Sequence, residues 1–145
     1  MFKITVIFAM DLSSNSMNET ISLSETRQFK AVFPNTLNAN DTLFGGQVMQ
    51  WMDEVAYITA TRFTRRRMFT VKIENIKFLK AVGPDSVVEV VGRVEETGTV
   101  RLSIKVDVFV EEMYGLSREK AMEGIFVFAA LDEEMRPQRL TSQIT

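Results

Sequence analysis

The sequence predicts an α+β fold in which antiparallel strands form a sheet around one long apolar helix. Between Gly46 and Thr61 the only charged residues are Asp53 and Glu54, and a helix this poor in charge is mostly buried. Strand-like segments joined by short turns follow the helix, and short turns imply antiparallel pairing. No second helix pattern has comparable strength, so the sheet must wrap around this helix.

Composition fits one domain and narrows the chemistry. The chain has 145 residues, of which 46% are hydrophobic and 25% charged, enough for a sizeable core. A formal net charge of -2 argues against a general nucleic-acid binder. The chain has no cysteine and no histidine, which excludes Ser-His and Cys-His catalysis and the common zinc sites. Acid–base chemistry must therefore come from carboxylates, lysine, tyrosine or water. We expect no metal and a cytoplasmic location.

Residues 1–20 read as an N-terminal extension of a single domain that covers residues 21–145. The apolar run 1–10 is too short to span a bilayer, and we expect no membrane association. A polar, low-complexity stretch follows it. The extension is expected to be poorly ordered or exchanged between subunits. Alternatively, Met17 is the true start of the protein.

A strand and a polar loop precede the helix. Residues 24–33 can form a strand, which Pro34 ends. The loop from Asn35 to Phe44 is rich in turn formers. They are Asn35, Asn38, Asn40 and Asp41. Asp41 or Thr42 is expected to cap the helix that follows.

The helix begins at the pair Gly45-Gly46 and runs to about Phe63. A helix start exposes backbone N–H groups with a positive potential, and glycine lets a ligand approach them closely. Asp53 lies two turns further on, at the edge of the apolar stripe. A carboxylate there either pairs with an arginine or a loop, or has a chemical role.

Three arginines, Arg65, Arg66 and Arg67, follow the helix end. Cations are favourable at a helix C-terminus, so a solvated helix end is the simpler interpretation. The sharper interpretation is a contact with phosphate oxygens, which arginine grips with paired N–H groups.

Four strands are predicted after the helix. In residues 69–80 the apolar alternation changes phase at Glu74-Asn75, which predicts a β-bulge. Residues 87–95 form a valine-rich strand, and Thr97-Gly98-Thr99 marks a tight hairpin. Residues 100–110 show the cleanest alternation in the chain, typical of a half-buried strand.

The last predicted strand covers residues 121–131 and ends in a continuous apolar run, which suits a strand covered on both faces. Residues from Asp132 onward are polar and are expected to be partly disordered.

The loop and helix resemble a known family. Residues 34–56 read PNTLNANDTLFGGQVMQWMDEVA, similar to the signature of the hotdog-fold acyl-CoA thioesterases of the YciA-type and cytosolic acyl-CoA hydrolase branch. The likeness continues through IENIKFLKAVGPDSVVEVVGRVEETGTVRLSIKVDVFVE, although Ala81 stands where related chains often have proline. The resemblance covers about residues 24–140.

This resemblance implies a five-stranded antiparallel sheet wrapped around one long central helix, in a double-hotdog dimer that assembles further into a trimer of dimers. It implies hydrolysis of acyl-CoA to free acid and CoA. The family's catalytic carboxylate maps onto Asp53. Its active-site asparagine maps onto Asn38, which would act with Asp53 of the partner subunit. The glycine pair maps onto Gly45 and Gly46.

On this hypothesis, N–H groups around Gly46 stabilise the oxyanion of the tetrahedral intermediate. Asp53 either activates a water as general base, the route we prefer, or attacks directly to form a mixed anhydride. Asn38 orients water or carbonyl. A thiolate leaves readily, so no strong general acid is required. No cofactor is expected, because coenzyme A is part of the substrate and product.

Substrate contacts are expected around the helix start and from scattered cations. The acyl chain should lie along the helix near Met49, Met52 and Trp51, although Trp51 fits better as a core residue. Each cation alone is more often a surface charge than a ligand, so only one or two should touch the phosphates. The candidates for CoA and substrate contacts are Asn40, Gly45, Arg65, Arg66, Arg67, Lys77, Lys80, Thr97, Gly98 and Thr99.

A non-catalytic module that binds or senses acyl-CoA is the alternative function, because fold alone does not choose between these roles. Asp53 and Asn38 favour the enzyme. A hotdog dehydratase is disfavoured, because those enzymes generally rely on a histidine.

Overall fold

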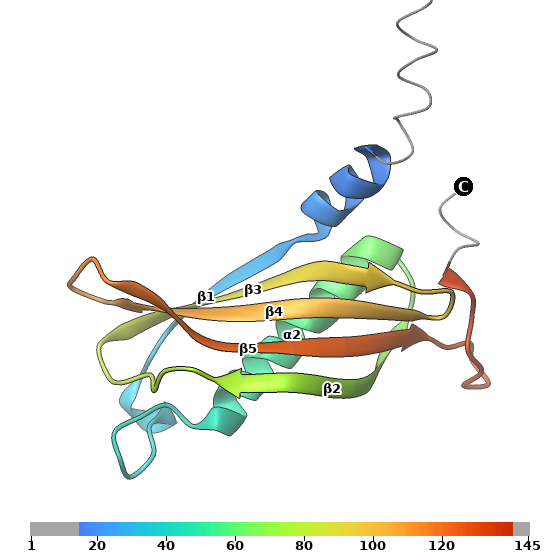
Figure 1. Cartoon of the computed structure of the whole chain (residues 1–145). Coiled ribbons are helices and arrows are strands. Elements are labelled where there is room, and N and C mark those ends of the chain that lie inside the picture. The colour runs from blue at the N-terminus through green and yellow to red at the C-terminus, as the bar shows by residue number, and fades with distance from the viewer. Residues whose placement is uncertain (1–14, 141–145) are drawn as a thin grey trace, which may run out of the picture.

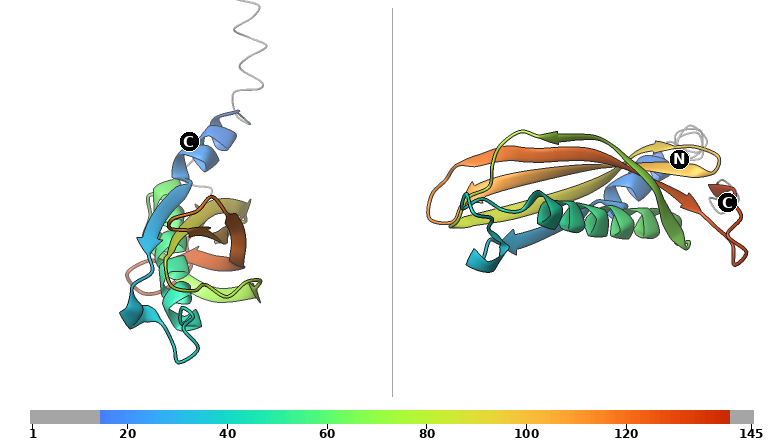
Figure 2. Two further views of the ribbon diagram at one scale, coloured as in Figure 1. Left: turned by 90° about the vertical axis from the view of Figure 1, so that its left-hand side faces the viewer. Right: turned by 90° about the horizontal axis from the view of Figure 1, so that it is seen from below.

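The structure, a computed structural model, describes residues 15–140. One antiparallel sheet of five strands packs against the long helix α2, Gly45–Thr64. Figure 1 shows the sheet in front of this helix, and the second view in Figure 2 shows it curving over the helix. The strands are β1 (Thr26–Ala31), β2 (Met68–Phe78), β3 (Ser86–Thr97), β4 (Arg101–Glu112) and β5 (Arg118–Ala130).

The strand order in the sheet is β1-β3-β4-β5-β2, which leaves β1 and β2 at the two edges. Every neighbouring pair is antiparallel. Tight connections join β3 to β4 and β4 to β5, as the short turns predicted. The α+β prediction is confirmed, and the sequence analysis missed only the short 3₁₀ turn Pro34–Thr36 and the helical residues 15–24.

Helix α2 buries one face against the inner side of the sheet and contacts all five strands. Its buried residues are Val48, Trp51, Met52, Val55, Ala56, Thr59 and Ala60. The helix crosses β3 at Gly92, where a Cβ atom would lie 2.5 Å from Thr59 Oγ1 and 2.9 Å from Val55 Cγ1. Only glycine permits this approach, so Gly92 sets how closely the helix sits on the sheet.

Buried and half-buried residues alternate strictly along strand β4, and its buried side chains contribute to the core. Its inward residues Leu102, Ile104, Val106 and Val108 are fully buried, while the residues between them are half-buried on the outer face. This confirms the strand predicted from period-two patterning, in which successive side chains point to opposite faces.

The predicted bulge in β2 is also confirmed. The pairing of β2 with β5 shifts register between Glu74 and Lys77, and Asn75 within that stretch has a φ of 55°. Asparagine tolerates this left-handed conformation better than most residues. A second shift, which the sequence analysis did not predict, lies between Thr70 and Lys72.

Charged pairs cover the outer face of the sheet. Glu89 on β3 is 5% exposed and is held by Arg27 of β1 at 2.7 Å and Arg118 of β5 at 3.3 Å. Glu123 on β5 accepts hydrogen bonds from Lys105 at 2.9 Å and Lys120 at 3.2 Å. The bond from Lys105 and then that from Lys120 lower the pKa of Glu123 from 4.5 to about 2. The Arg27–Glu89 and Lys105–Glu123 pairs link neighbouring strands, whereas Arg118 reaches Glu89 across β4 and Lys120 bonds to Glu123 within β5.

The structure describes part of each end of the chain. Residues 15–24 are helical, and the guanidinium of Arg62 on α2 donates to backbone carbonyls at the end of this segment, including that of Glu25 at 2.9 Å. Residues 1–14 lie outside the described residues. Near the other end, Leu140 is buried and its N–H donates to the carbonyl of Thr99 at 2.7 Å. The polar tail therefore folds back at least as far as this residue.

Within residues 15–140, no helix combines the length and hydrophobicity needed to cross a bilayer.

Candidate active site

The start of α2 presents backbone donors without a side-chain cap. Phe44 occupies the cap position, and its carbonyl accepts hydrogen bonds from the N–H groups of Gln47 and Val48. No acceptor within residues 15–140 takes the N–H groups of Gly45 and Gly46. A helix start left in this way attracts an oxygen that carries negative charge.

Space is open in front of Gly46. A Cβ atom built on Gly46 would meet no atom within 4 Å, whereas one on Gly45 would lie 3.2 Å from a ring carbon of Phe78. Gly46 is exposed and Gly45 half-buried. The backbone of Gly46 is thus the more accessible donor, while Gly45 allows the ring of Phe78 to pack against the helix start.

The prediction that Asp41 or Thr42 caps the helix is wrong, because neither side chain bonds to the helix start. The side chain of Thr42 bonds to Asn38. The Asn38 Oδ1 atom accepts hydrogen bonds from the N–H groups of Asn40 at 2.9 Å and Thr42 at 3.2 Å, and from the hydroxyl of Thr42 at 3.1 Å. The hydroxyl that was expected to cap the helix therefore organises the loop before it. Asn38 itself is half-buried.

Asp53 lies on the exposed side of α2. Its Oδ1 accepts a hydrogen bond from the hydroxyl of Thr70 on β2 at 3.4 Å. Among the described residues, no lysine or arginine forms an ion pair with Asp53. A carboxylate with one weak partner is free to accept a proton or a hydrogen bond from a ligand.

Thr70 was missed by the sequence analysis. It has no motif of its own, and it reaches Asp53 only because the edge strand β2 passes beside the helix. The second register shift of β2 begins at Thr70, but this irregularity follows from pairing with β5 and has no signature in the sequence.

Asn38 and Asp53 are not hydrogen-bonded to each other anywhere in residues 15–140. We expect the two residues to meet across two subunits. That arrangement stays a prediction.

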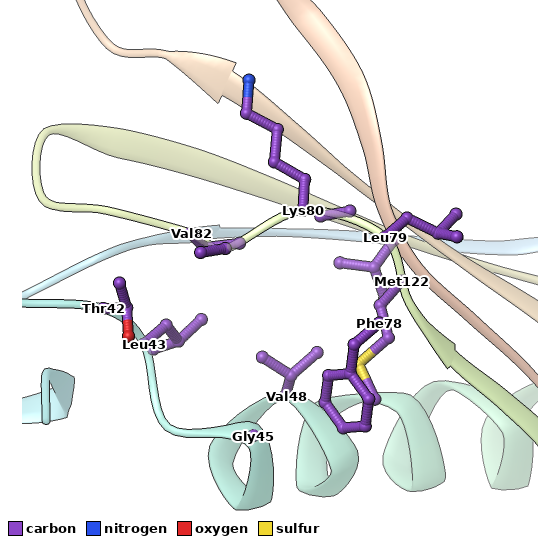
Figure 3. Close-up of a pocket in the computed structure, with 12 residues that line it drawn as sticks. Thr42, Leu43, Gly45, Val48, Phe78, Leu79, Lys80, Val82 and Met122 are labelled. Atoms are coloured by element: carbon purple, nitrogen blue, oxygen red, sulfur yellow. The ribbon is translucent and has the colours of Figure 1, made fainter. Parts of the chain in front are cut away.

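A cavity of about 310 Å³ opens beside the helix start. Figure 3 shows it between the first turn of α2 and the segment that follows β2, with Lys80 pointing away from the helix. Its lining is mostly apolar and includes neither Asp53 nor Asn38. The lining residues are Thr42, Leu43, Gly45, Val48, Phe78, Leu79, Lys80, Ala81, Val82, Val108, Ala121 and Met122.

The candidate lysines and arginines differ in whether they are already paired. Lys80 forms an ion pair with Glu119 at 2.6 Å, and Lys77 lies 3.8 Å from Glu123. The guanidinium of Arg66 donates to the carbonyl of Arg139 at 2.7 Å.

Arg65 and Arg67 are exposed, and their side chains have no hydrogen bond or ion pair to another described residue. Arg65 ends the helix in a left-handed conformation with a φ of 55°. These two arginines are therefore the ones free to meet a phosphate.

The hairpin Thr97-Gly98-Thr99 lies at the end of the sheet where α2 finishes, away from the helix start, as Figure 1 shows. Its expected role as a loop of backbone donors is only partly possible. The N–H of Gly98 already donates to the carbonyl of Arg101 at 2.8 Å. The single chain therefore does not bring this loop and Gly45 to one site.

The apolar residues expected along the acyl chain are mostly core. Met52 is fully buried, and Trp51 is 9% exposed, as its interpretation as a core residue predicted. Met49 is half-buried against the core. Asn40 is exposed, and its N–H is engaged by Asn38.

The described residues contain no cluster of three or more aspartate or glutamate side chains placed to hold a metal ion.

The sheet order and the helix that the sheet encloses define a hotdog fold. This fold, with a carboxylate on its central helix, indicates a thioester hydrolase. Residues 40–116 match the thioesterase superfamily, and the chain belongs to that family.

Two curated relatives narrow the comparison. The chain is 34% identical over 121 residues to an uncharacterized acyl-CoA thioester hydrolase of Bacillus subtilis, covering 82% of this chain and 70% of the relative. It is 34% identical over 110 residues to the acyl-CoA thioester hydrolase YciA of Escherichia coli, covering 74% and 83% of the two chains. The resemblance to the acyl-CoA thioesterase branch is thereby confirmed.

Solved structures of acyl-CoA thioesterases superpose on this chain. An apo-hexameric acyl-CoA thioesterase superposes with a TM-score of 0.79 at 27% identity, over 82% of this chain and 76% of the other. An acyl-CoA hydrolase of Staphylococcus aureus, solved with butyryl coenzyme A, coenzyme A and coenzyme A disulfide, superposes with a TM-score of 0.77 at 28% identity, over 82% and 73%. That hydrolase was also solved with single aspartate, threonine and asparagine residues replaced by alanine.

Proposed function

We propose that this protein hydrolyses acyl-CoA thioesters to a free carboxylic acid and coenzyme A, with Asp53 as the catalytic carboxylate. The observation that carries the proposal is the set of contacts of Asp53 within residues 15–140: the hydroxyl of Thr70 is its one partner there, no described cation pairs with it, and it lies on the helix whose first N–H groups have no described acceptor. Glu54, the next residue, is also exposed and has no cationic partner among the described residues, so the hydroxyl of Thr70 is what distinguishes Asp53 from it.

In the proposed reaction, Asp53 takes a proton from water as the water oxygen attacks the thioester carbonyl carbon. The carbonyl oxygen becomes an oxyanion, and an N–H donor such as that of Gly46 stabilises it by about 2.7–4 kcal/mol. The oxyanion collapses, the C–S bond breaks and the thiolate leaves. Direct attack by Asp53, with an anhydride intermediate, is the other route by which the same carboxylate could act.

Spacing along the chain supports the assignment of three residues. In the Staphylococcus aureus hydrolase the replaced asparagine, aspartate and threonine are separated by 15 and 17 residues. Asn38, Asp53 and Thr70 have the same separations here. We therefore place Thr70 in the site as the hydroxyl that orients Asp53.

A second copy of the chain would complete the site along the edge strand β2. Val71 and Ile73 on this strand are 42% and 39% exposed, and the strand has backbone groups without a neighbour on its outer side. Pairing of two β2 strands would extend the sheet and bring the partner subunit's Asn38 towards Asp53. Assembly of three such dimers into a hexamer, the state named for one of the solved neighbours, is part of the proposal.

Arg65 and Arg67 are the best candidates for the CoA phosphates, since Arg66, Lys77 and Lys80 already have partners. The apolar cavity at the helix start would receive an apolar part of the substrate. No cofactor is required in this scheme, and a cytoplasmic location stays a prediction.

The experiment that tests the proposal measures thiol release from acetyl-, butyryl- and longer acyl-CoAs. Wild type should release CoA, and Asp53→Asn should lose most turnover while it keeps its melting temperature. Glu54→Gln, the neighbouring exposed carboxylate with no role in the scheme, is the matched control and should behave as wild type. If the wild type binds CoA but releases no thiol, the chain is a binding module, and if Asp53→Asn remains fully active, the assigned role of Asp53 is wrong.

A further inference from the structure

The side-chain amide of Asn38 has only one orientation that satisfies its hydrogen bonds. Its Oδ1 accepts three hydrogen bonds, two of them from the backbone N–H groups of Asn40 and Thr42. Backbone N–H groups can only donate, so exchanging the positions of Oδ1 and Nδ2 would place donors against donors. The orientation of the amide is thus set by the loop chemistry.

The Nδ2 group is what remains for a ligand. None of residues 15–140 supplies a hydrogen-bond acceptor for it. Asn38 can therefore offer N–H donors and no free acceptor.

Among residues 15–140, the hydroxyl of Thr42 is the only side-chain donor to Asn38 Oδ1. It donates to Oδ1 of Asn38 at 3.1 Å, while the backbone carbonyl of Thr42 accepts the N–H of Asn38 at 2.7 Å. Thr42 also lines the cavity beside the helix start, two residues from the cap position (Figure 3).

We propose that Thr42 is a positioning residue that holds the Asn38 amide with Nδ2 outward, so that Asn38 donates to the thioester carbonyl oxygen and does not accept a hydrogen bond from the attacking water. A donor aimed at the attacking water would withdraw electron density from it, whereas a donor on the carbonyl oxygen strengthens as the oxyanion forms. This inference rests on the proposed function and assigns the direction of one of its hydrogen bonds.

The kinetic test compares variants on butyryl-CoA. Asn38→Asp keeps an oxygen for the three loop donors but removes Nδ2, so kcat should fall about 10²–10³-fold, with little change in melting temperature. Thr42→Val removes one hydrogen bond from the amide, so kcat should fall roughly 3–10-fold with KM nearly unchanged. Thr42→Ser restores the hydroxyl and should recover most of that loss.

Thr36→Val is the matched control. Its hydroxyl donates to the carbonyl of Phe33 at 2.7 Å, just before the same loop, and does not touch Asn38. It should leave kcat unchanged. If Asn38→Asp or Thr42→Val retains the wild-type kcat, or if Thr42→Val lowers only the melting temperature, the proposal is overturned.

A readout without turnover separates this inference from the proposed function. In ¹⁵N-labelled protein, the side-chain amide signals that vanish in Asn38→Asp belong to Asn38. We expect these signals to shift or broaden in Thr42→Val but not in Thr36→Val, and unchanged signals in Thr42→Val would contradict the positioning role. A wild type that shows this pattern but releases no thiol would refute the proposed function and leave the role of Thr42 intact.

Discussion

The hydrogen bond from Thr70 to Asp53 is 3.4 Å long, close to the limit at which such a contact counts as a bond. A bond of this length orients the carboxylate without neutralising it. It also ties the site to β2, because Thr70 belongs to that strand while Asp53 belongs to α2. The orientation of Asp53 thus depends on the position of the neighbouring strand β2.

Replacing Thr70 by valine should reduce kcat for acyl-CoA hydrolysis roughly 3–10-fold, the equivalent of one lost hydrogen bond. Thr70 is exposed, so the free energy of unfolding should change little. Steady-state kinetics on the purified variant checks this, with Thr70→Ser as the control that keeps the hydroxyl. Equal rates in Thr70→Val and wild type would remove Thr70 from the site.

A second prediction at the scale of one residue concerns Gly92. Gly92→Ala would force a methyl group to within 2.5 Å of Thr59 Oγ1, so the helix or the strand must shift. We expect a loss of about 1–3 kcal/mol in the free energy of unfolding, measured by urea denaturation.

Gly83→Ala is the control for Gly92→Ala, because a Cβ atom at Gly83 has no neighbour within 4 Å and no glycine in the described chain has a positive φ. It should be nearly neutral. The close-approach argument fails if the two alanine variants are equally stable.

At the scale of the element, the outer face of the sheet is stabilised by charge pairs between strands. Glu123 is the best-connected carboxylate, with Lys105 and Lys120 bonded to it and Lys77 opposite on β2. Its pairs join β5 to β4 on one side and to the edge strand on the other. Protonation of this one group should therefore loosen three strands at once.

This gives a prediction on pH. Because the pKa of Glu123 is lowered to about 2 in the folded protein, the folded state favours the charged form more than the unfolded state does. Its contribution to stability is present above pH 4.5, the ordinary pKa, and is lost as the pH falls towards 2. Urea unfolding of wild type and Glu123→Gln across this range should show the difference between them shrinking as the pH falls. A difference that is constant with pH would contradict the prediction.

The elements that sequence patterns could predict are those whose pattern is local. Strand β4 follows from alternation along the chain, and the bulge at Asn75 follows from a change of phase in one strand. Helix α2 follows from a long stretch almost free of charge. In each case the signal and the structure occupy the same residues.

The features that were missed depend on partners far away in the sequence. The cap was wrong because Thr42 bonds to Asn38, a competing contact within the loop that spacing alone does not rank. Leu140 is buried by the hairpin at Thr99, and the helical residues 15–24 end at carbonyls that Arg62 binds. Thr70 was missed for the same reason, because it reaches Asp53 only through the path of strand β2 beside the helix.

At the scale of the whole molecule, the sheet has two edges with different surroundings. The β2 edge carries exposed Val71 and Ile73 and lies beside Asp53, while the β1 edge carries Phe29, which is 59% exposed. A dimer formed along β2 would complete two active sites, one on each side of the joined strands. A dimer along β1 would leave Asp53 without a partner loop.

We predict that Ile73→Lys dissociates the proposed dimer and lowers turnover together with it, because in the proposed site Asp53 of one subunit works with a loop of the other. Light scattering coupled to size exclusion measures the mass, and thiol release measures turnover. Phe29→Lys, on the opposite edge, is the control and should retain both the pair and the activity. Full activity in a monomeric Ile73→Lys protein would show that one chain suffices.

The uncapped start of α2 has a consequence for engineering. Phe44 stands where serine, aspartate or asparagine would satisfy a backbone N–H and contribute about 1 kcal/mol. A protein selected only for thermal durability would be expected to carry such a residue. In the proposed site the same N–H groups bind the oxyanion of the substrate, so we expect a capping side chain at residue 44 to slow the proposed reaction, and thermostabilising designs should avoid this position.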